Sequence, residues 1–173
     1  MNKRFSYWLC LAVLLTFTSC TKDEREDNQR KQIENYIKNT LKKEVDEQNG
    51  VYLVLLATDS SGAIPVWINK NDRVEFEYQA WTLGGSVFAT SDDSIAIKSG
   101  LVPLRMGAVK VGVGQLIKGL DIGLQRMALG DYGIILFPFT LGYGSEQYVG
   151  NVPPESALIF EVFITKVNNH SYP

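Results

Sequence analysis

The stretch from Arg73 to Trp81 alternates strictly between apolar and polar side chains, and this pattern restricts the fold more than any other feature. One face of the stretch is apolar: Val74, Phe76, Tyr78 and Ala80. The other face carries Glu75, Glu77, Gln79 and Trp81. A period of two residues is that of a β-strand with one buried and one solvated face, which is typical of antiparallel sheets. The sequence therefore predicts a fold built on an antiparallel sheet.

Further strands are predicted on both sides of this one. They are Val51–Ala57, Ser86–Ala89, Ala108–Val113, Gly133–Phe139 and Ala157–Val167. A single short helix is expected at Lys118–Met127, ended by Gly130, with Leu120, Leu124 and Met127 on one face. Several antiparallel strands with one helix of this size make an α+β fold, in which the sheet wraps around the short helix.

Residues 1–19 are predicted to be a lipoprotein signal peptide. Lys3 and Arg4 give a positive start, Tyr7–Phe17 is a short apolar run, and Thr18-Ser19-Cys20 closes it. The run is too short for a comfortable membrane span. A small residue before a cysteine resembles the lipobox of bacterial lipoproteins, in which the cysteine becomes the acylated N-terminus of the mature chain. The alternative is an ordinary signal peptide cleaved nearby, which would leave Cys20 as a free thiol.

Residues 20–50 are predicted to form a lipid-anchored tether and a spacer helix. The charged run Lys22–Asp27 resembles the surface-export signal of Bacteroidetes lipoproteins, and it also suits a solvated, disordered tether. Residues 24–48 contain neither Gly nor Pro. An apolar stripe recurs there every four residues: Ile33, Ile37, Leu41 and Val45. Asn49-Gly50 would stop this helix, because both residues tolerate a left-handed conformation. We expect a cell-envelope protein, an outer-membrane lipoprotein that faces the periplasm or the outside.

Charge and histidine content argue against other functions. A formal net charge of −2 does not suit a nucleic-acid binder, which needs a concentrated basic face. The single histidine, His170, stands close to the C-terminus. Neither a His-based metal site nor a Ser-His-Asp triad is therefore expected. The sequence predicts no cofactor and no metal ion.

Three segments between Asp72 and Val167 carry recognisable motifs. The first joins Val74–Tyr78 to Gly84-Gly85-Ser86-Val87-Phe88-Ala89-Thr90-Ser91. The second is Val111-Gly112-Val113-Gly114-Gln115-Leu116-Ile117-Lys118-Gly119-Leu120, followed by Gly123-Leu124 and Met127–Gly130. The third joins Leu141-Gly142-Tyr143-Gly144 to Val152-Pro153-Pro154-Glu155-Ser156-Ala157-Leu158-Ile159-Phe160-Glu161-Val162. In this order and spacing the segments resemble the FKBP family of peptidyl-prolyl isomerases.

This resemblance implies an FKBP-type isomerase domain over residues 51–173, with an FKBP-like sheet wrapped around one helix. Rotation about an X-Pro amide faces a barrier of about 18–20 kcal/mol because resonance is lost. No covalent bond breaks, so a dry aromatic pocket that prefers the twisted amide is sufficient for catalysis. The implied partners are proline-containing polypeptide clients, with macrolides as candidate ligands and the membrane reached through the lipid.

Carried over position by position, the resemblance gives catalytic roles to Tyr78, Phe88, Ile117, Tyr143 and Phe160. Phe88 and Phe160 would wall the proline ring, while the Ile117 N–H and the Tyr143 hydroxyl would bind substrate carbonyls. Substrate-binding roles fall on Leu116, Leu120, Tyr148 and Val152, with Leu120 as the floor where the family usually has Trp. The alternative is that these are core side chains, as aromatics in strands usually are.

Several positions depart from the family pattern. Ala89 replaces an acidic residue that would pair with Tyr78, Gly107 replaces a wall phenylalanine, and Asn151 replaces an isoleucine. The segment 91–106 is longer than in the family, and Asp92 or Asp93 within it could supply the missing carboxylate. Each lost wall residue would weaken binding by about 1–3 kcal/mol. Reduced activity is therefore expected. A catalytically weak peptide-binding or chaperone lipoprotein and a structural envelope component docked through its N-terminal helix stay open as alternatives.

Overall fold

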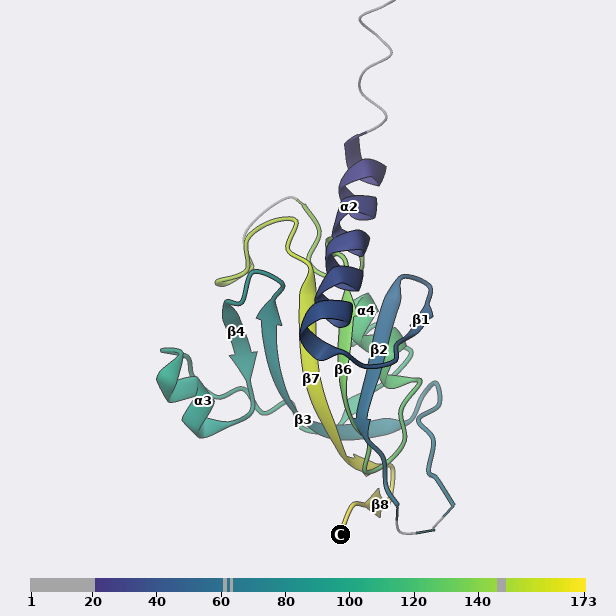
Figure 1. Cartoon of the computed structure of the whole chain (residues 1–173). Helices are drawn as coiled ribbons and strands as arrows, with labels where there is room; N and C mark the ends of the chain where they lie inside the picture. The colour runs from purple at the N-terminus through teal and green to yellow at the C-terminus, as the bar shows by residue number, and fades with distance from the viewer. Residues whose placement is uncertain (1–20, 61, 63, 146–148) are drawn as a thin grey trace, which may run out of the picture.

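The computed structural model describes residues 21–60, 62, 64–145 and 149–173 (Figure 1). Its strands are β1 (Asp46–Gln48), β2 (Val51–Ala57), β3 (Arg73–Thr82), β4 (Val87–Thr90), β5 (Val109–Lys110), β6 (Tyr132–Phe137), β7 (Leu158–Val167) and β8 (His170–Ser171). Its helices are α2 (Thr21–Tyr36), α3 (Asp93–Lys98) and α4 (Lys118–Leu124), with a π-helical turn at Ile37–Leu41 and a 3-10 turn, η2, at Phe139–Leu141. The strands form one antiparallel sheet in the order β1-β2-β6-β7-β3-β4, while β5 pairs with β3 and β8 with β7. The predicted α+β class is confirmed.

The longest strand pair, β3 with β7, forms the centre of the sheet. Its register runs from Val74 opposite Val167 to Thr82 opposite Leu158. Burial alternates along β3 as the sequence predicted, with the apolar face buried and Glu77 exposed. The expected inner face of β7 is also buried: Leu158, Phe160, Val162 and Ile164.

Helix α4 covers the inner face of the sheet and completes the larger hydrophobic core. Two glycines in this short helix, Gly119 and Gly123, face β6. A Cβ atom at Gly119 would overlap the ring of Phe137, and one at Gly123 would overlap the side chain of Ile135. The close approach of helix and sheet therefore explains why glycines with poor helix propensity stand here.

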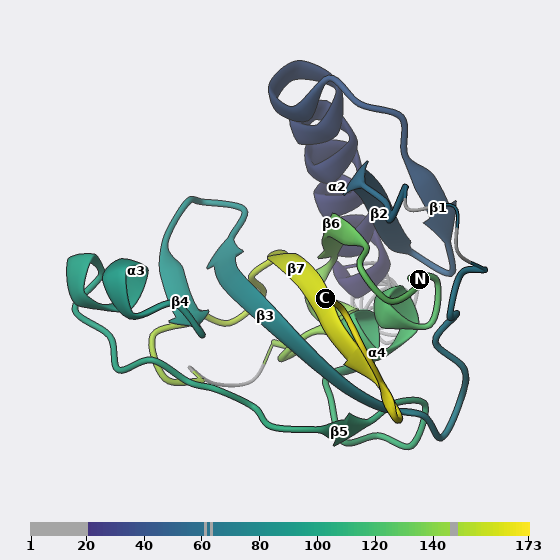
Figure 2. The ribbon, with the colours of Figure 1, turned by 90° about the horizontal axis from the view of Figure 1, so that it is seen from below.

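Helix α2 covers the opposite, outer face, so the sheet lies between two helical layers (Figure 2). Ile33 and Ile37 are buried there against a second core formed by β2, β6 and the start of β7. The predicted spacer helix thus packs on its own domain. The run Lys22–Asp27, interpreted above as suited to a disordered tether, lies within α2. The boundary placed between residues 50 and 51 stays a prediction.

The prediction that this helix extends to Gln48 is wrong. The helical segment ends at Leu41, where Lys42 takes a left-handed conformation (φ 52°) and donates its N–H to the Ile37 carbonyl at 2.8 Å. Asn49 and Gly50 are instead the two central residues of a β1–β2 hairpin, since Gln48 pairs with Val51. Both have positive φ, 53° and 77°, as a two-residue type I′ hairpin turn requires.

The long segment after β4 contains α3, which the sequence did not predict. Its first turn is capped by Asp92, whose carboxylate accepts the Ile95 N–H at 2.8 Å. The signal peptide of residues 1–19, Cys20 and Tyr148 lie outside the described residues. In the part of the chain that the structure describes, no helix is long and apolar enough to span a membrane.

Candidate active site

Aromatic rings from four strands and one loop meet on the inner face of the sheet. Phe160 of β7 is at their centre, with its ring centroid 5.8 Å from that of Phe137, 5.7 Å from Phe88 and 6.2 Å from Tyr78. Tyr143 contacts Phe88 edge-on, at 6.1 Å between centroids. These five residues form what we call the aromatic cluster. Four of the five predicted catalytic residues are therefore brought together, and Phe137 is an additional member.

Burial divides this cluster into a base and a rim. Phe160 is 3% exposed, Tyr78 is 5% exposed and Phe137 is fully buried, so these rings belong to the hydrophobic core. Tyr143 is 36% exposed, and Phe88 is partly buried against the same core. Burial therefore favours the core interpretation for Phe160, Tyr78 and Phe137. The catalytic roles of Phe88 and Tyr143, which are more exposed, stay a prediction.

The other predicted site residues surround the base. Leu116 and Ile117 pack partly exposed against the core, and Ile117 precedes the first residue of α4 in an extended conformation. Leu120 and Val152, assigned to substrate binding, are each only 2% exposed. They lie beneath the surface as parts of the core.

A tight turn after η2 presents Tyr143. The N–H groups of Gly142 and Gly144 both donate to the Phe139 carbonyl, each at 3.0 Å. Gly144 has a φ of 80°, which a residue with a side chain rarely adopts. The backbone around Tyr143 is therefore fixed by hydrogen bonds, and its phenol stands at the rim.

The two tyrosines of the cluster are held in their neutral form. Burial raises the pKa of Tyr78 to about 12, and the nearby Tyr143 contributes in the same direction. Burial also raises the pKa of Tyr143. A neutral phenol can donate a hydrogen bond to a carbonyl oxygen, whereas a phenolate cannot. Both hydroxyl groups are thus available as donors at ordinary pH.

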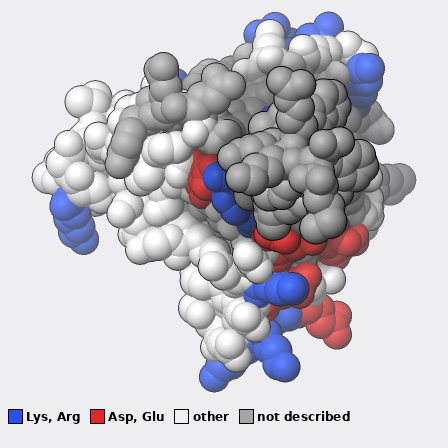
Figure 3. Space-filling view, turned by 90° about the horizontal axis from the view of Figure 1, so that it is seen from above, with Lys and Arg blue, Asp and Glu red and all other residues white. Residues whose placement is uncertain are grey.

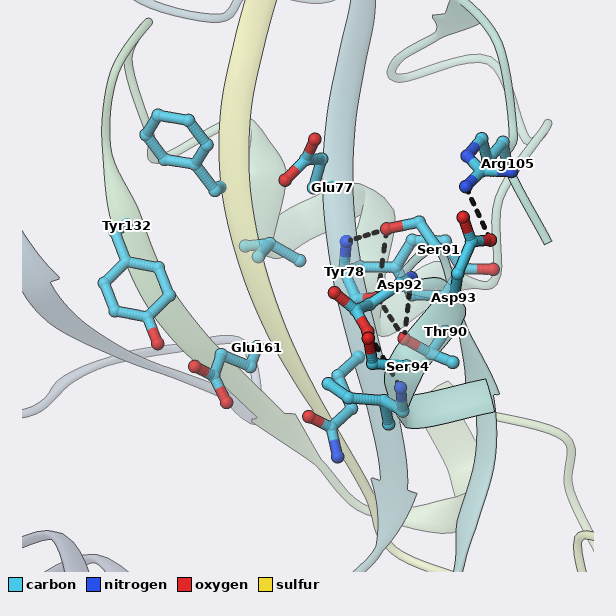
Figure 4. Close-up of a pocket in the computed structure, with 14 residues that line it drawn as sticks. Glu77, Tyr78, Thr90, Ser91, Asp92, Asp93, Ser94, Arg105, Tyr132 and Glu161 are labelled. Carbon is cyan, nitrogen blue, oxygen red and sulfur yellow. Dashed lines mark hydrogen bonds and ion pairs between the residues drawn. The ribbon is translucent and has the colours of Figure 1, made fainter. Parts of the chain in front are cut away.

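Asp92 and Asp93, which could supply the carboxylate missing at Ala89, interact with other groups. Asp92 caps α3, and the Asp93 carboxylate forms an ion pair with Arg105 at 2.7 Å. Both line a polar cleft of about 420 Å³ together with Glu77, Tyr132 and Glu161 (Figure 4). Glu77 belongs to the face of β3 that points away from the aromatic cluster, and burial raises the pKa of Glu161. No motif in the sequence indicates this cleft, because its lining residues are far apart in the chain.

On the face seen along α2, charged side chains are unevenly spread (Figure 3). Seen along α2, charged side chains of both signs gather on one side, and the side of β4 is mostly uncharged (Figure 3). Among the described residues, no three His, Cys, Asp or Glu side chains are grouped closely enough to hold a metal ion.

An antiparallel sheet closed over a short helix, with an aromatic cluster rimmed by a loop tyrosine, defines an α+β domain with an apolar, aromatic candidate site. Residues 65–165 match the model of the family described as FKBP-type peptidyl-prolyl cis-trans isomerase. The chain belongs to this family.

Relatives of known identity agree with this assignment. FK506-binding protein 1 of Gibberella zeae is 32% identical over 112 residues, which is 65% of this chain and 94% of the relative. The peptidyl-prolyl cis-trans isomerase of Schizosaccharomyces pombe is 32% identical over 110 residues, or 64% of this chain and 90% of that protein. Peptidyl-prolyl cis-trans isomerase FKBP10 of Mus musculus is 36% identical over 107 residues, which are 62% of this chain but only 17% of that longer protein.

Proposed function

We propose that this chain is a peptidyl-prolyl cis-trans isomerase that acts at the rim of the aromatic cluster. The observation that carries the proposal is the contact between Phe88 and Tyr143 above a buried Phe160, in a chain of this family. Two rings at the rim offer a proline side chain an apolar surface on which it loses water. The Tyr143 hydroxyl, at the rim, would donate a hydrogen bond to a neighbouring peptide carbonyl.

The proposed mechanism is preferential binding of the twisted amide. In the planar ground state the amide nitrogen shares its electron pair with the carbonyl, and this resonance is lost midway through rotation. An environment without water favours the less polar, twisted form. Hydrogen bonds from Tyr143 and the Ile117 N–H to the flanking carbonyls would hold the peptide in position while the bond rotates. Interactions stronger in the twisted state than in either planar state lower the barrier.

A second candidate function is peptide binding or chaperone activity with little catalysis. One observation favours it. The base of the cluster is almost completely buried, which leaves a shallow contact surface for a proline ring. In this alternative, extended peptides bind at Phe88 and Tyr143 without accelerated isomerisation.

We further propose that the protein works in the cell envelope as a lipoprotein acylated at Cys20. The support is the sequence before Cys20, which resembles a lipobox, and the charged run that follows it. The clients would be envelope or exported proteins, and macrolides are candidate ligands of the aromatic cluster. Mass spectrometry of the mature N-terminus tests the acylation. An unmodified thiol at Cys20, or a mature chain that begins elsewhere, would contradict it.

The isomerase proposal is tested with a Leu-Pro peptide, the purified full chain and two matched tyrosine variants. Tyr143→Phe removes only a hydroxyl group and should lower kcat/KM about three- to tenfold, the effect of one hydrogen bond. Tyr132→Phe, in the polar cleft, should leave the rate unchanged. If the folded wild-type chain isomerises the peptide no faster than buffer alone, the proposal that the chain is an isomerase is refuted. Binding of the same peptide would then support the second candidate.

A further inference from the structure

The 3-10 turn η2, which begins the loop carrying Tyr143, starts without a cap of its own. Its first residue, Phe139, is 1% exposed, and the preceding Pro138 makes no side-chain hydrogen bond to the turn. The Phe139 N–H is instead bound by a residue of α2, more than a hundred positions away. The side-chain oxygen of Gln29 accepts it at 3.0 Å. A helix outside the matched family segment, residues 65–165, thus supplies the cap for the loop of the site.

The other end of Gln29 binds the far stem of the same loop. Its side-chain NH₂ group donates to the Glu155 carbonyl. The Glu155 N–H donates to the Gly144 carbonyl at 2.9 Å, and the Gly144 N–H donates to the Phe139 carbonyl at 3.0 Å. These bonds form a closed ring from Gln29 through Phe139, Gly144 and Glu155 back to Gln29. Tyr143 is adjacent to Gly144 within this ring.

A second contact from α2 reaches the same point. Arg25, one helical turn before Gln29, forms an ion pair with the Glu155 carboxylate at 2.5 Å. Glu155 has a φ of 57°, which a residue with a side chain adopts only when its surroundings hold it there. Residues four apart lie on one face of a helix, so α2 presents Arg25 and Gln29 together to the loop.

We propose that α2 positions the loop of the active site and that Gln29 is the positioning residue. This inference rests on the proposed function for its effect on activity. The hydrogen bonds of Gln29 reach the two stems of the loop, at Phe139 and Glu155, and not the rings of Phe88 and Tyr143. Gln29 acts by fixing both stems of the loop, so that the Tyr143 phenol stays against Phe88.

The test compares Gln29→Ala with Gln32→Ala in the purified full chain. Gln32 is an exposed residue of the same helix, so the control makes the same change of residue type and helix propensity. We expect Gln29→Ala to lower kcat/KM for the Leu-Pro peptide about three- to tenfold, and Gln32→Ala to leave it unchanged. Amide hydrogen exchange of Phe139, Gly144 and Glu155 should become faster by a similar factor.

Exchange at Ile164 of β7 separates positioning from general loosening of the fold, because this N–H donates to the backbone carbonyl of Asp131, just before β6 and away from the loop. It should be the same in both variants. Equal activity and equal loop exchange in the two variants would overturn the proposal. So would an acceleration of Ile164 as large as that of Gly144. If the wild-type chain shows no isomerase activity, the proposed function fails, and the exchange of Gly144 and Glu155 still decides whether Gln29 holds the loop.

Discussion

Replacement of Phe160 by alanine should destabilise the domain strongly, because this ring is the meeting point of the aromatic cluster. It is 3% exposed and contacts the rings of Phe137, Phe88 and Tyr78. Core Phe→Ala substitutions cost about 3–5 kcal/mol, since buried area is lost and a cavity remains. The stacked contact with Phe137 adds specific ring–ring energy. We therefore expect the free energy of unfolding to fall by about 4 kcal/mol, out of a total of about 5–15 kcal/mol for a domain.

Urea unfolding followed by tryptophan fluorescence measures this change. With an m-value of about 2 kcal/mol per M urea, the midpoint should fall by about 2 M. Phe163→Ala is the matched control on the same strand. The ring of Phe163 is partly exposed, points to the other face, and contacts the ring of Tyr172 at 5.2 Å between centroids. It should cost about 1 kcal/mol. The reasoning is refuted if Phe160→Ala lowers the free energy of unfolding by less than about 1.5 kcal/mol, or if the two variants lower it equally. The Phe160 ring would then be exposed at the surface of a pocket and not packed in the hydrophobic core.

Two further predictions concern Tyr78 and the glycines of the inner face. Because the pKa of Tyr78 is raised from 10 to about 12, its contribution to stability is fully present below pH 10 and is lost as the pH rises toward 12. Urea midpoints at pH 9 and pH 11.5 should differ less in Tyr78→Phe than in the wild-type chain, and an equal difference would contradict the assignment. Gly119→Ala places a Cβ on the ring of Phe137 and should cost about 2–3 kcal/mol by overpacking, whereas Gly107→Ala meets open space and should change stability by less than about 0.5 kcal/mol. Thermal unfolding of the two variants measures both values, and similar melting temperatures would refute the contrast.

The central strands could be predicted from local chemistry, and the residues of the aromatic cluster from the resemblance to the FKBP family. The alternation along β3 defines a strand by itself, and the motifs around Phe88, Tyr143 and Phe160 retain the spacing of the family. The degree of burial could not be predicted in the same way. Which rings form the base and which form the rim depends on how far β4 and the η2 loop extend over the sheet, and no single motif encodes that distance.

The errors at the N-terminal end have a specific physical cause. Asn-Gly is favoured wherever two successive residues need positive φ or a helix must end, so Asn49-Gly50 suits a hairpin as well as a helix stop. The strand Val51–Ala57, which follows Gly50 directly, is the feature of the sequence that favours a hairpin over a helix stop. The contacts of Gln29 with Phe139 and Glu155 join residues more than a hundred positions apart, and helix periodicity gives no information on them.

The position of α2 also sets where the domain would operate. This helix spans Thr21–Tyr36, 16 residues with a length of about 24 Å at 1.5 Å per residue, and it is packed on the domain. If Cys20 carries a lipid as we propose, only the first turns of α2 separate the bilayer from the loop of Tyr143, because Arg25 and Gln29 already contact that loop. The domain would then keep both a short height above the lipid headgroups and a preferred orientation. Polypeptides emerging at the membrane would be within its reach, and those free in the surrounding fluid would have to diffuse to the surface first.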